Sequence, residues 1–347
     1  VVGNRQKFDA QGRVPVNLTR RNTWLGEYED NWKSGEVITL AASIAGLFHD
    51  FGKANDLFQQ KLSPNKNSKT YEPYRHEWIS LRLFQAFVGL QADTDEEWLT
   101  RLQNVTAASE SEMRVRLQQD APGQTGNANP LVSLPKFAQL VAWLVVSHHK
   151  LPMYPKRGNA KPDLEYIEQW QDKLFDAAWN SWNCLDEWDD ESLRRNWTFT
   201  EKTPLASQTW RDKAGELAKR ALNYPLLLQN DWLENTFTRH LARLSLMVAD
   251  HYYSAQEKKA KWQDESYQCH ANTNEQGLNQ KLDEHNIGVA ANAYWLARRL
   301  PRLKVDLPSL GYDRKFVKHT DIALFKWQNK AFELAKSLEE QTQTYGF

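Results

Sequence analysis

Seven imidazole and carboxylate residues stand at the ends or on the buried faces of apolar segments, where such groups are costly to bury without a partner. They are His49, Asp50, His76, His148, His149, Asp250 and His285. Imidazole and carboxylate ligands without thiolate suit Mn, Fe, Co or Ni, with Zn as an alternative, and they argue against a closed structural zinc site. We therefore expect one or two divalent transition metals, with Asp50 as a bridging ligand. Two neighbouring metals activate water and bind both oxygens of an in-line attack on a phosphodiester.

Each candidate also has an ordinary structural interpretation. An adjacent His49–Asp50 pair is often a surface pair or a helix cap, and His148–His149 suits a polar helix C-terminus. His76 can be a plain first-turn residue, and Asp250 can pair with Arg243. Lys53 is either a solvated lysine or a contact to a substrate phosphate. The remaining histidines, His240, His251, His270 and His319, lie in polar segments and are expected at the surface or fully hydrogen-bonded.

Apolar helices must position these groups. The first runs from Ile38 and is expected to stop at Gly52, because glycine tolerates the left-handed conformation that ends helices. Others are predicted at about 55–62, from His76 through HEWISLRLFQAFVGL, from Leu134 to His149, over FTRHLARLSLMVADHYYS and over LNQKLDEHNIGVAANAYWLARRL. Residues 106–130 are polar and are expected to form an exposed loop. Segment 162–240 is expected to add helices that cover one side. The prediction is an all-α bundle with helical and loop insertions, whose ligands converge at one end of the core.

Composition excludes several classes of protein. The 347 residues carry 44 Lys+Arg and 44 Asp+Glu, so any nucleic-acid site must be a local basic patch. Two cysteines, Cys184 and Cys269, make no disulfide framework and favour a cytoplasmic location. No apolar run is long enough to span a membrane, and no signal peptide is evident. No glycine-rich phosphate loop, CxxC pair or GxSxG motif occurs. The initial Val suggests a piece of a longer protein.

The order of the motifs resembles the HD nuclease domain of the CRISPR-associated nuclease-helicase of type I systems, and most of all its subtype I-F branch. HDFGK at 49–53, RHE at 75–77, SHH at 147–149 and RLSLMVAD at 243–250 follow the family's order. The resemblance covers most of residues 38–300. It implies an HD-domain fold and a metal-dependent nuclease that degrades single-stranded DNA exposed by a guide-RNA surveillance complex. Asp50 and Lys53 are then the catalytic residues, and the seven residues named first are the metal ligands.

One motif departs from the family's order. The family normally has a histidine on a helix before the HD pair, and no histidine precedes His49 here. The late segment LDEHNIGVAANAYWLARRLP looks like this missing motif. We therefore interpret 280–300 as a permuted first motif helix and His285 as its ligand, a rearrangement that is easy where chain termini lie close together.

The resemblance also suggests domain limits and partners. We assign 1–320 to the nuclease domain and 321–347 to the truncated start of a superfamily 2 helicase domain, where Gln328 matches the adenine-reading glutamine. ATP is then needed only by the missing helicase part. Further expected partners are the CRISPR adaptation integrase, through a missing N-terminal part, and a phage anti-CRISPR inhibitor.

Other functions stay open at this point. An HD phosphohydrolase acting on small nucleotides would use the same ligands, and a non-catalytic docking module would keep the fold without a complete ligand set. Two basic stretches are candidates for guiding a DNA backbone, although solvated helix faces are the preferred interpretation of each. They are Lys258, Lys259 and Lys261, and Arg298, Arg299 and Arg302.

Overall fold

The computed structural model describes residues 32, 34–62, 72–89, 94–121, 129–150, 189–302, 329, 330 and 333. The chain divides into the units Val1–Lys33 and Ser34–Phe347, and every element below belongs to the second. The described helices are α2 (Gly35–Phe48), α3 (Asp56–Lys61), α4 (His76–Val88), α5 (Asp95–Gln103), α6 (Ser109–Arg116), α7 (Lys136–Ser147), α9 (Asp190–Asn196), α10 (Gln208–Leu222), α11 (Pro225–Gln229), α12 (Thr236–Ser254) and α13 (Leu282–Arg299).

Short elements complete this part of the chain. Four 3-10 turns are η2 (Phe51–Ala54), η6 (Pro204–Ala206), η7 (Ala260–Trp262) and η8 (Leu300–Arg302). Strands β1 (Thr273–Asn274) and β2 (Gly277–Leu278) form a small antiparallel hairpin in which Thr273 pairs with Leu278. The predicted all-α class is confirmed.

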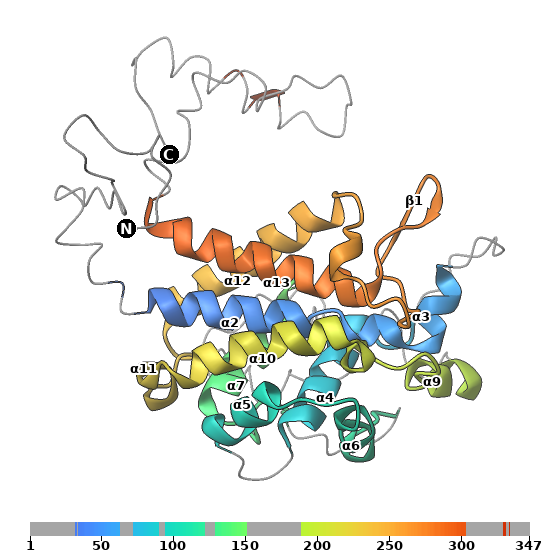
Figure 1. Cartoon of the computed structure of the whole chain (residues 1–347), viewed down its shortest axis with the longest axis horizontal. Helices are drawn as coiled ribbons and strands as arrows, with labels where there is room; N and C mark the ends of the chain where they lie inside the picture. The colour runs from blue at the N-terminus through green and yellow to red at the C-terminus, as the bar shows by residue number, and fades with distance from the viewer. Residues whose placement is uncertain are drawn as a thin grey trace, which may run out of the picture. The chain divides into compact units, whose positions relative to one another are not determined.

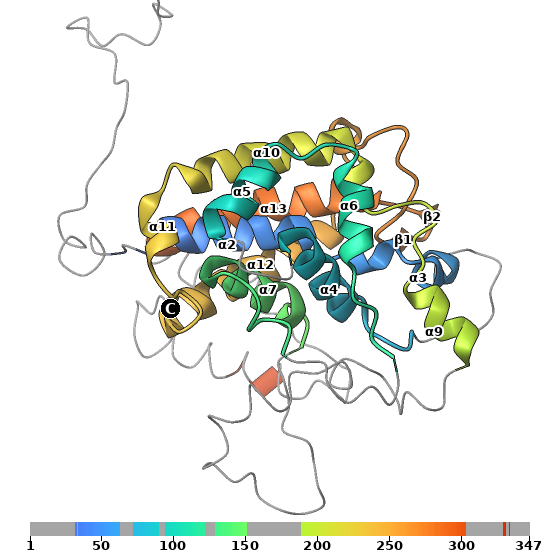
Figure 2. The same ribbon diagram turned by 90° about the horizontal axis from the view of Figure 1, so that it is seen from below.

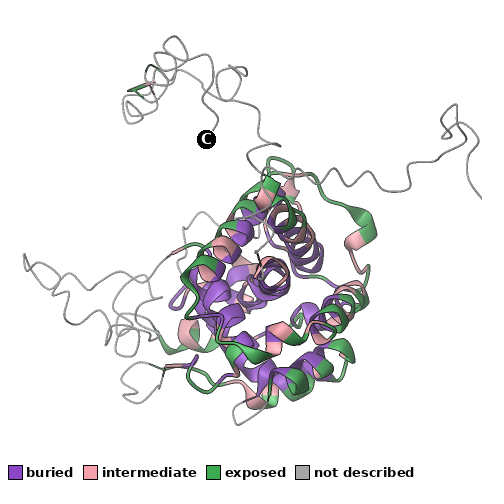
Figure 3. Ribbon diagram, turned by 90° about the vertical axis from the view of Figure 1, so that its left-hand side faces the viewer, coloured by how far each residue is buried: buried purple, intermediate pink, exposed green. Residues whose placement is uncertain are grey.

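Helix α2 is the centre of the bundle. Its residues from Val37 to Phe48 are all buried, as the apolar sequence predicts. It packs against α13, α12, α7 and α10, and Figure 1 shows it running between α13 and α10. Figure 3 looks along the bundle and shows buried residues on the facing sides of the helices and exposed residues at the rim.

The small residues of α2 allow the closest of these helix contacts. A Cβ atom at Gly46 would lie 2.9 Å from the Cα atom of Ala290 on α13. That spacing leaves no room for a methyl group, so a glycine is needed for α2 and α13 to approach this closely. This contact fixes how closely the middle of α13 approaches the last turn of α2.

The expected end of the first helix was wrong. Helix α2 ends at Phe48 with His49 as its C-cap, and Gly52 lies inside the 3-10 turn η2. Among the described glycines only Gly89 and Gly277 have a positive φ. Gly52 is therefore required for space rather than for a left-handed conformation, as the contacts at the site below make clear.

The polar segment 106–130 was also misjudged in part. It contains helix α6, and its acidic residues Glu110 and Asp120 are buried. Asp120 accepts hydrogen bonds from Arg82 at 2.7 and 2.9 Å and from Trp78 at 2.6 Å, which fastens the segment to α4. A polar pattern indicates exposure only when its charges have no buried partner, and here they have one. Residues 122–128 lie outside the described part.

The predicted cover of one side is confirmed for residues 190–229. Figure 2 shows α10 beside α5 over one face of the bundle, and α10 buries Trp210 against α2 through a 3.1 Å bond to the carbonyl of Leu47. The tryptophan-rich stretch 151–188 lies outside the described residues, as does most of the segment 321–347, including Gln328. No described helix has the length and the apolar character needed to cross a membrane.

Candidate metal centre

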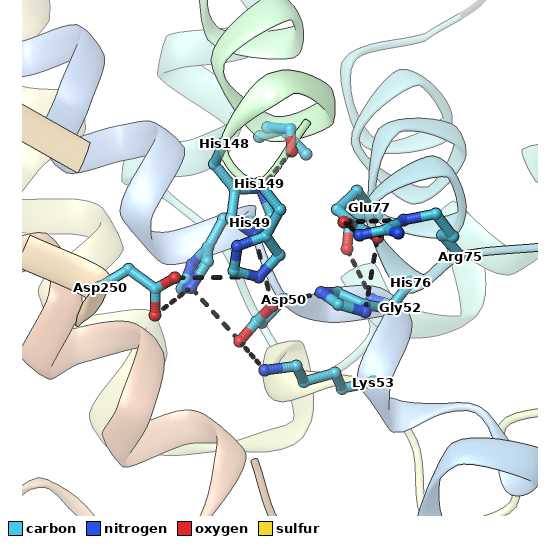
Figure 4. A network of polar contacts seen from close by, with 12 residues as sticks. His49, Asp50, Gly52, Lys53, Arg75, His76, Glu77, His148, His149 and Asp250 are labelled. Carbon is cyan, nitrogen blue, oxygen red and sulfur yellow. Dashed lines mark hydrogen bonds and ion pairs between the residues drawn. The ribbon is translucent and has the colours of Figure 1, made fainter. Parts of the chain in front are cut away.

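Five helices bring all seven predicted side chains to one place, and Figure 4 labels each of them except His285. The end of α2 supplies His49 and Asp50, the start of α4 supplies His76, and the end of α7 supplies His148 and His149. Asp250 comes from the last turns of α12, and His285 from the first turn of α13. The sequence places these residues far apart, and the bundle brings them within contact distance.

Asp50 is the centre of this cluster. Its Oδ2 atom lies 3.3 Å from His49 Nε2 and 3.2 Å from His285 Nε2. Its Oδ1 atom faces the other way, 3.2 Å from His76 Nε2 and 3.8 Å from His148 Nε2. The two oxygens of one carboxylate therefore serve two different sets of histidines.

Two groups of donor atoms follow from this arrangement, each with its atoms within 4.8 Å of one another. The first contains Asp50, His76, His148 and His149, and the second contains His49, Asp50, Asp250 and His285. All four members of the second group are buried, whereas in the first the side chains of His76 and His149 keep 12% and 30% exposure. The groups share Asp50, and the first is the one open to solvent.

Six buried nitrogen and oxygen atoms of the two groups form no hydrogen bond among the described residues. They are the Nε2 atoms of His49, His76, His148 and His285 and both carboxylate oxygens of Asp50, of which Oδ2 is paired with the charge of Lys53. Buried polar atoms without a hydrogen bond are rare and costly, and here they converge on one place. Imidazole nitrogens and carboxylate oxygens are ligands that transition metals accept. The residues present therefore fit two cations, one for each group.

The other ring nitrogen of each buried histidine is engaged by the protein. The Nδ1 atom of His49 lies 2.8 Å from the carbonyl of Gly46, and that of His148 lies 2.6 Å from the carbonyl of Val145. A carbonyl can only accept, so both rings donate from Nδ1, and in the neutral imidazole the lone pair is on Nε2. Such partners fix the ring orientation and the tautomer that metal binding needs.

His76 has a charged partner instead. Its Nδ1 atom lies 3.5 Å from Glu77 Oε2, and Glu77 accepts from Arg75 at 2.5, 3.1 and 3.2 Å. Burial alone would raise the pKa of Glu77, but His76 and Arg75 outweigh it and hold that pKa well below its usual range. The buried carboxylate therefore stays ionised beside the imidazole. Sequence reasoning had given Glu77 and Arg75 no role of their own.

Gly52 lets α4 approach the HD pair. A Cβ atom at Gly52 would lie 2.2 Å from the carbonyl oxygen of His76. The backbone N–H of Gly52 donates to Ser80 Oγ at 2.8 Å. Only glycine fits this contact, which brings the start of α4 next to Asp50.

Charge interactions within the cluster are strong. Burial raises the pKa of Asp50, but His49 and Lys53 outweigh this and hold it well below its usual range. Burial likewise lowers the pKa of His49, and the carboxylates of Asp50 and Asp250 reverse the effect and raise it to about 10. Without a bound cation, the carboxylates draw protons to the neighbouring imidazole.

The histidines at the end of α7 behave in the opposite way. Burial, together with the charges of His149 and His49, holds the pKa of His148 well below its usual range. Burial and the charge of His76 lower the pKa of His149 to about 4. Both rings are therefore neutral near pH 7, which is the form that a metal ligand requires.

Lys53 lies against the same carboxylate. Its Nζ atom is 2.6 Å from Asp50 Oδ2, and 14% of its side chain remains exposed. Burial lowers the pKa of Lys53, but Asp50 and Asp250 raise it on balance, so the side chain is a cation. Lys53 is thus a charged member of the cluster rather than a solvated lysine.

The alternative partner of Asp250 is ruled out by geometry. Arg243 donates to the carbonyl of Ser147 at 2.7 and 2.9 Å. Asp250 instead faces His49 at 3.7 Å and His285 at 3.4 Å through Oδ1, and His149 at 3.9 Å through Oδ2. Arg243 therefore stabilises the end of α7, immediately before His148.

The remaining histidines of the described residues take no part in the cluster. His240 and His251 are exposed and His270 is half-buried, as expected from their polar surroundings, while His319 lies outside the described residues.

The sequence of this chain matches a known protein family. The family model for "Cas3, HD domain" matches residues 16–249, which is more than half of the chain. The chain belongs to the Cas3 HD domain family. The match contains the HD pair, His76 and the His148–His149 doublet, and the family resemblance inferred from those motifs is confirmed.

Two curated relatives in this family cover the whole chain. The CRISPR-associated nuclease/helicase Cas3 subtype I-F/YPEST of Pectobacterium atrosepticum is 44% identical over 355 residues. The protein of the same description from Pseudomonas aeruginosa is 36% identical over 351 residues. In each case the alignment spans 100% of this chain and 32% of the relative, so the chain corresponds to about a third of their length. The predicted subtype is thereby confirmed.

The Cas3 HD family match ends at residue 249, just before Asp250. Asp250 and His285 therefore join the cluster through the structure and not through the family match. His285 lies 3.2 Å from Asp50, and its origin in a permuted first motif helix stays a prediction.

Proposed function

We propose that this chain is a metal-dependent nuclease domain that cuts single-stranded DNA, and that it binds two divalent cations bridged by Asp50. The observation that carries the proposal is the sharing of the Asp50 carboxylate between two groups of unsatisfied donors. Membership of the Cas3 HD domain family supports the assignment to nucleic-acid hydrolysis.

The seven residues predicted from the sequence are the proposed ligands. His76, His148 and His149 hold the cation on the exposed side, His49, Asp250 and His285 hold the buried one, and Asp50 binds both. Nitrogen and oxygen donors without sulfur favour Mn, Fe, Co or Ni, with Zn as an alternative.

When bound, two such cations would supply an activated water and stabilise the charge that develops on the attacked phosphodiester. The chain's own residues orient the reaction. The exposed edges of His76 and His149 mark the side from which a strand enters, because the other group is buried. The side chain of Lys53 remains 14% exposed at this centre. We propose that its ammonium group contacts a phosphate oxygen of the substrate.

The lysine-rich turn around η7 is the proposed guide for the strand. Lys258, Lys259 and Lys261 are exposed, and the backbone of the turn is fixed because Glu284, next to His285, accepts from Lys259 N and Gln263 Nε2. Lys259 and Lys261 lie 4.8 and 5.2 Å from the ring centroid of Trp262, so cations and an aromatic ring stand together. Single strands are held by this combination of charge and stacking.

The other basic stretch is a weaker candidate for guiding DNA. Arg298 lies 3.4 Å from Glu36, which also contacts Arg220 at 2.6 Å. These contacts give Arg298 a place in a surface ion-pair network on α13, away from the lysine turn.

The biological setting is also a proposal. The relatives are CRISPR-associated nuclease/helicases, and we infer that the strand is DNA opened by a guide-RNA surveillance complex in the cytoplasm. The expected contacts with an integrase and with a phage inhibitor, and the use of ATP, concern longer proteins of the family and stay predictions.

Two other functions make different predictions. A phosphohydrolase of small nucleotides would use the same cations but turn over mononucleotides. A docking module without catalysis would not need to gather six unsatisfied donor atoms, and this cluster argues against it.

Cleavage of a circular single-stranded DNA without ATP tests the proposal. Mn, Co and Ni are supplied in turn to the wild-type chain and to Asp50→Ala. Metal-dependent linearisation that the substitution abolishes is the expected result. Turnover of mononucleotides with intact circles would favour the phosphohydrolase, and a folded chain inactive in both assays would favour the docking module.

A further inference from the structure

We propose that Gln280 is a positioning residue that selects Nε2 of His285 as the metal-facing atom and holds α12 and α13 in register at the buried cation site. The inference rests on the metal centre proposed above. It concerns a residue outside the seven predicted ligands and outside the family match at 16–249.

Gln280 is completely buried and uses all of its side-chain hydrogen-bonding capacity. Its Nε2 atom donates to the carbonyls of Tyr253 at 2.9 Å and Gln256 at 2.8 Å. Its Oε1 atom lies 2.9 Å from His285 Nδ1 and accepts from Asn272 Nδ2 at 3.0 Å. An amide has two N–H groups and two oxygen lone pairs, and each of them has a partner here.

The orientation of this amide is fixed by its neighbours. The carbonyls of Tyr253 and Gln256 can only accept, so they must face the amide nitrogen. Asn272 is fixed in the same way, because its Oδ1 atom accepts from Gln280 N at 3.1 Å. An exchanged amide would place Gln280 Oε1 against two carbonyl oxygens. The oxygen must therefore face His285.

The protonation of His285 follows directly. Because Gln280 Oε1 can only accept, the ring must carry its proton on Nδ1. When the imidazole is neutral, its lone pair is on Nε2, the atom that lies 3.2 Å from Asp50 and 3.4 Å from Asp250. For His49 and His148 backbone carbonyls do the same, but His285 depends on a side chain that substitution can remove.

The second role of Gln280 is mechanical. Tyr253 and Gln256 stand at the end of α12, within two turns of Asp250, and Gln280 precedes α13, which carries His285. One amide therefore bonds to the ends of both helices that supply ligands to the buried group. Second-shell partners of this kind typically change metal affinity by about 10–100-fold.

Three variants of the 347-residue chain separate these roles. Gln280→Leu removes both the acceptor and the tether, and Gln280→Glu keeps an acceptor for Nδ1 but loses the two donated bonds. Asn272→Ala is the matched control, because it disturbs the same amide without touching the bond to His285. Each variant is titrated with Zn²⁺ to count bound equivalents, and its melting is followed by circular dichroism. The zinc form labelled with ¹⁵N-histidine is examined by NMR, with His285→Gln to identify the signals.

The expected wild-type spectrum has zinc on Nε2 of His285 and a slowly exchanging proton on Nδ1. Gln280→Leu is expected to weaken one of two zinc equivalents by about 10–100-fold and to expose the Nδ1 proton to exchange. Gln280→Glu is expected to keep both equivalents within a few-fold of wild type, because it retains the acceptor that fixes the ring of His285, while its melting temperature falls. Asn272→Ala is expected to keep both equivalents.

Several results would overturn the proposal. Zinc bound through Nδ1 of His285 would do so, as would a folded Gln280→Leu that keeps both equivalents at wild-type affinity. Equal losses of zinc affinity in Gln280→Leu and Gln280→Glu would show that Gln280 acts only by bonding α12 to α13, and they would refute the selection of Nε2. If Gln280→Leu does not fold, the proposal is tested by the zinc-bound NMR spectrum of the wild-type chain and by the zinc affinity of Gln280→Glu. A wild-type chain that binds no zinc would refute the metal centre itself, and the protected Nδ1 proton of the metal-free chain would then still test the contact with Gln280.

Discussion

Replacing Gly52 with alanine should disable the exposed cation site through a steric effect alone. The added Cβ atom would lie 2.2 Å from the carbonyl oxygen of His76, and real Cβ contacts essentially never fall below 3.0 Å. The start of α4 must therefore retreat by about 0.8 Å, and a shift near 1 Å in a reacting group costs about 10²-fold in rate. His76 is the ligand carried away from Asp50, so the loss should fall on its group of donors.

The expected result is a folded chain that binds one metal equivalent tightly and cuts single-stranded DNA about 10²-fold more slowly. Overpacking should also lower the free energy of unfolding by about 1–3 kcal/mol. Metal is counted by elemental analysis after gel filtration, and stability by urea denaturation.

Gly215→Ala is the matched control for this prediction. Gly215 lies on α10, away from the cluster, and a Cβ atom there would lie 3.0 Å from the carbonyl oxygen of Gln103 on α5. This variant should keep both metal equivalents and full activity. If Gly52→Ala keeps two equivalents and the wild-type rate, the steric reasoning is wrong.

Three further predictions address the ligand, the substrate and the fold. His285→Gln should remove one metal equivalent and most DNA cleavage; unchanged metal content and cleavage would end the idea of a permuted ligand. Replacing Lys258, Lys259 and Lys261 together with serine should raise KM for single-stranded DNA, while turnover of a small phosphodiester stays unchanged. The slope of log binding constant against log salt concentration should become shallower by about 0.7 for each lost phosphate contact. An unchanged KM and salt dependence would exclude the lysine turn as a guide. Asp120→Asn should cost about 3–5 kcal/mol in urea denaturation because Arg82 is left buried without its charged partner, and a cost below about 1 kcal/mol would contradict the assigned role of this pair.

The candidate ligands could be singled out because each stands at an end or on the buried face of an apolar helix, where a histidine or aspartate is conspicuous. For His285, which lies far from the HD pair, the ligand role was inferred from the resemblance of its segment to the family's first motif. How the ligands divide into two groups was not predictable. It depends on the direction in which each oxygen of Asp50 points, and that follows from the crossing of five helices.

Residues that act through the backbone of others were missed for the same reason. Gln280 looks like an ordinary loop glutamine until the carbonyls of Tyr253 and Gln256 are placed around it. Gly52 was interpreted as a helix end, since its contact with His76 exists only in three dimensions. Glu110 resembled an exposed residue because its partner, Thr203, lies on a distant segment.

Diffraction from crystals of the manganese-loaded chain, recorded to enhance anomalous scattering from manganese, tests the central claim most directly. The account predicts two anomalous peaks with the Asp50 carboxylate between them, one beside His76, His148 and His149 and one beside His49, Asp250 and His285. A single peak, or peaks that do not contact Asp50, would contradict it.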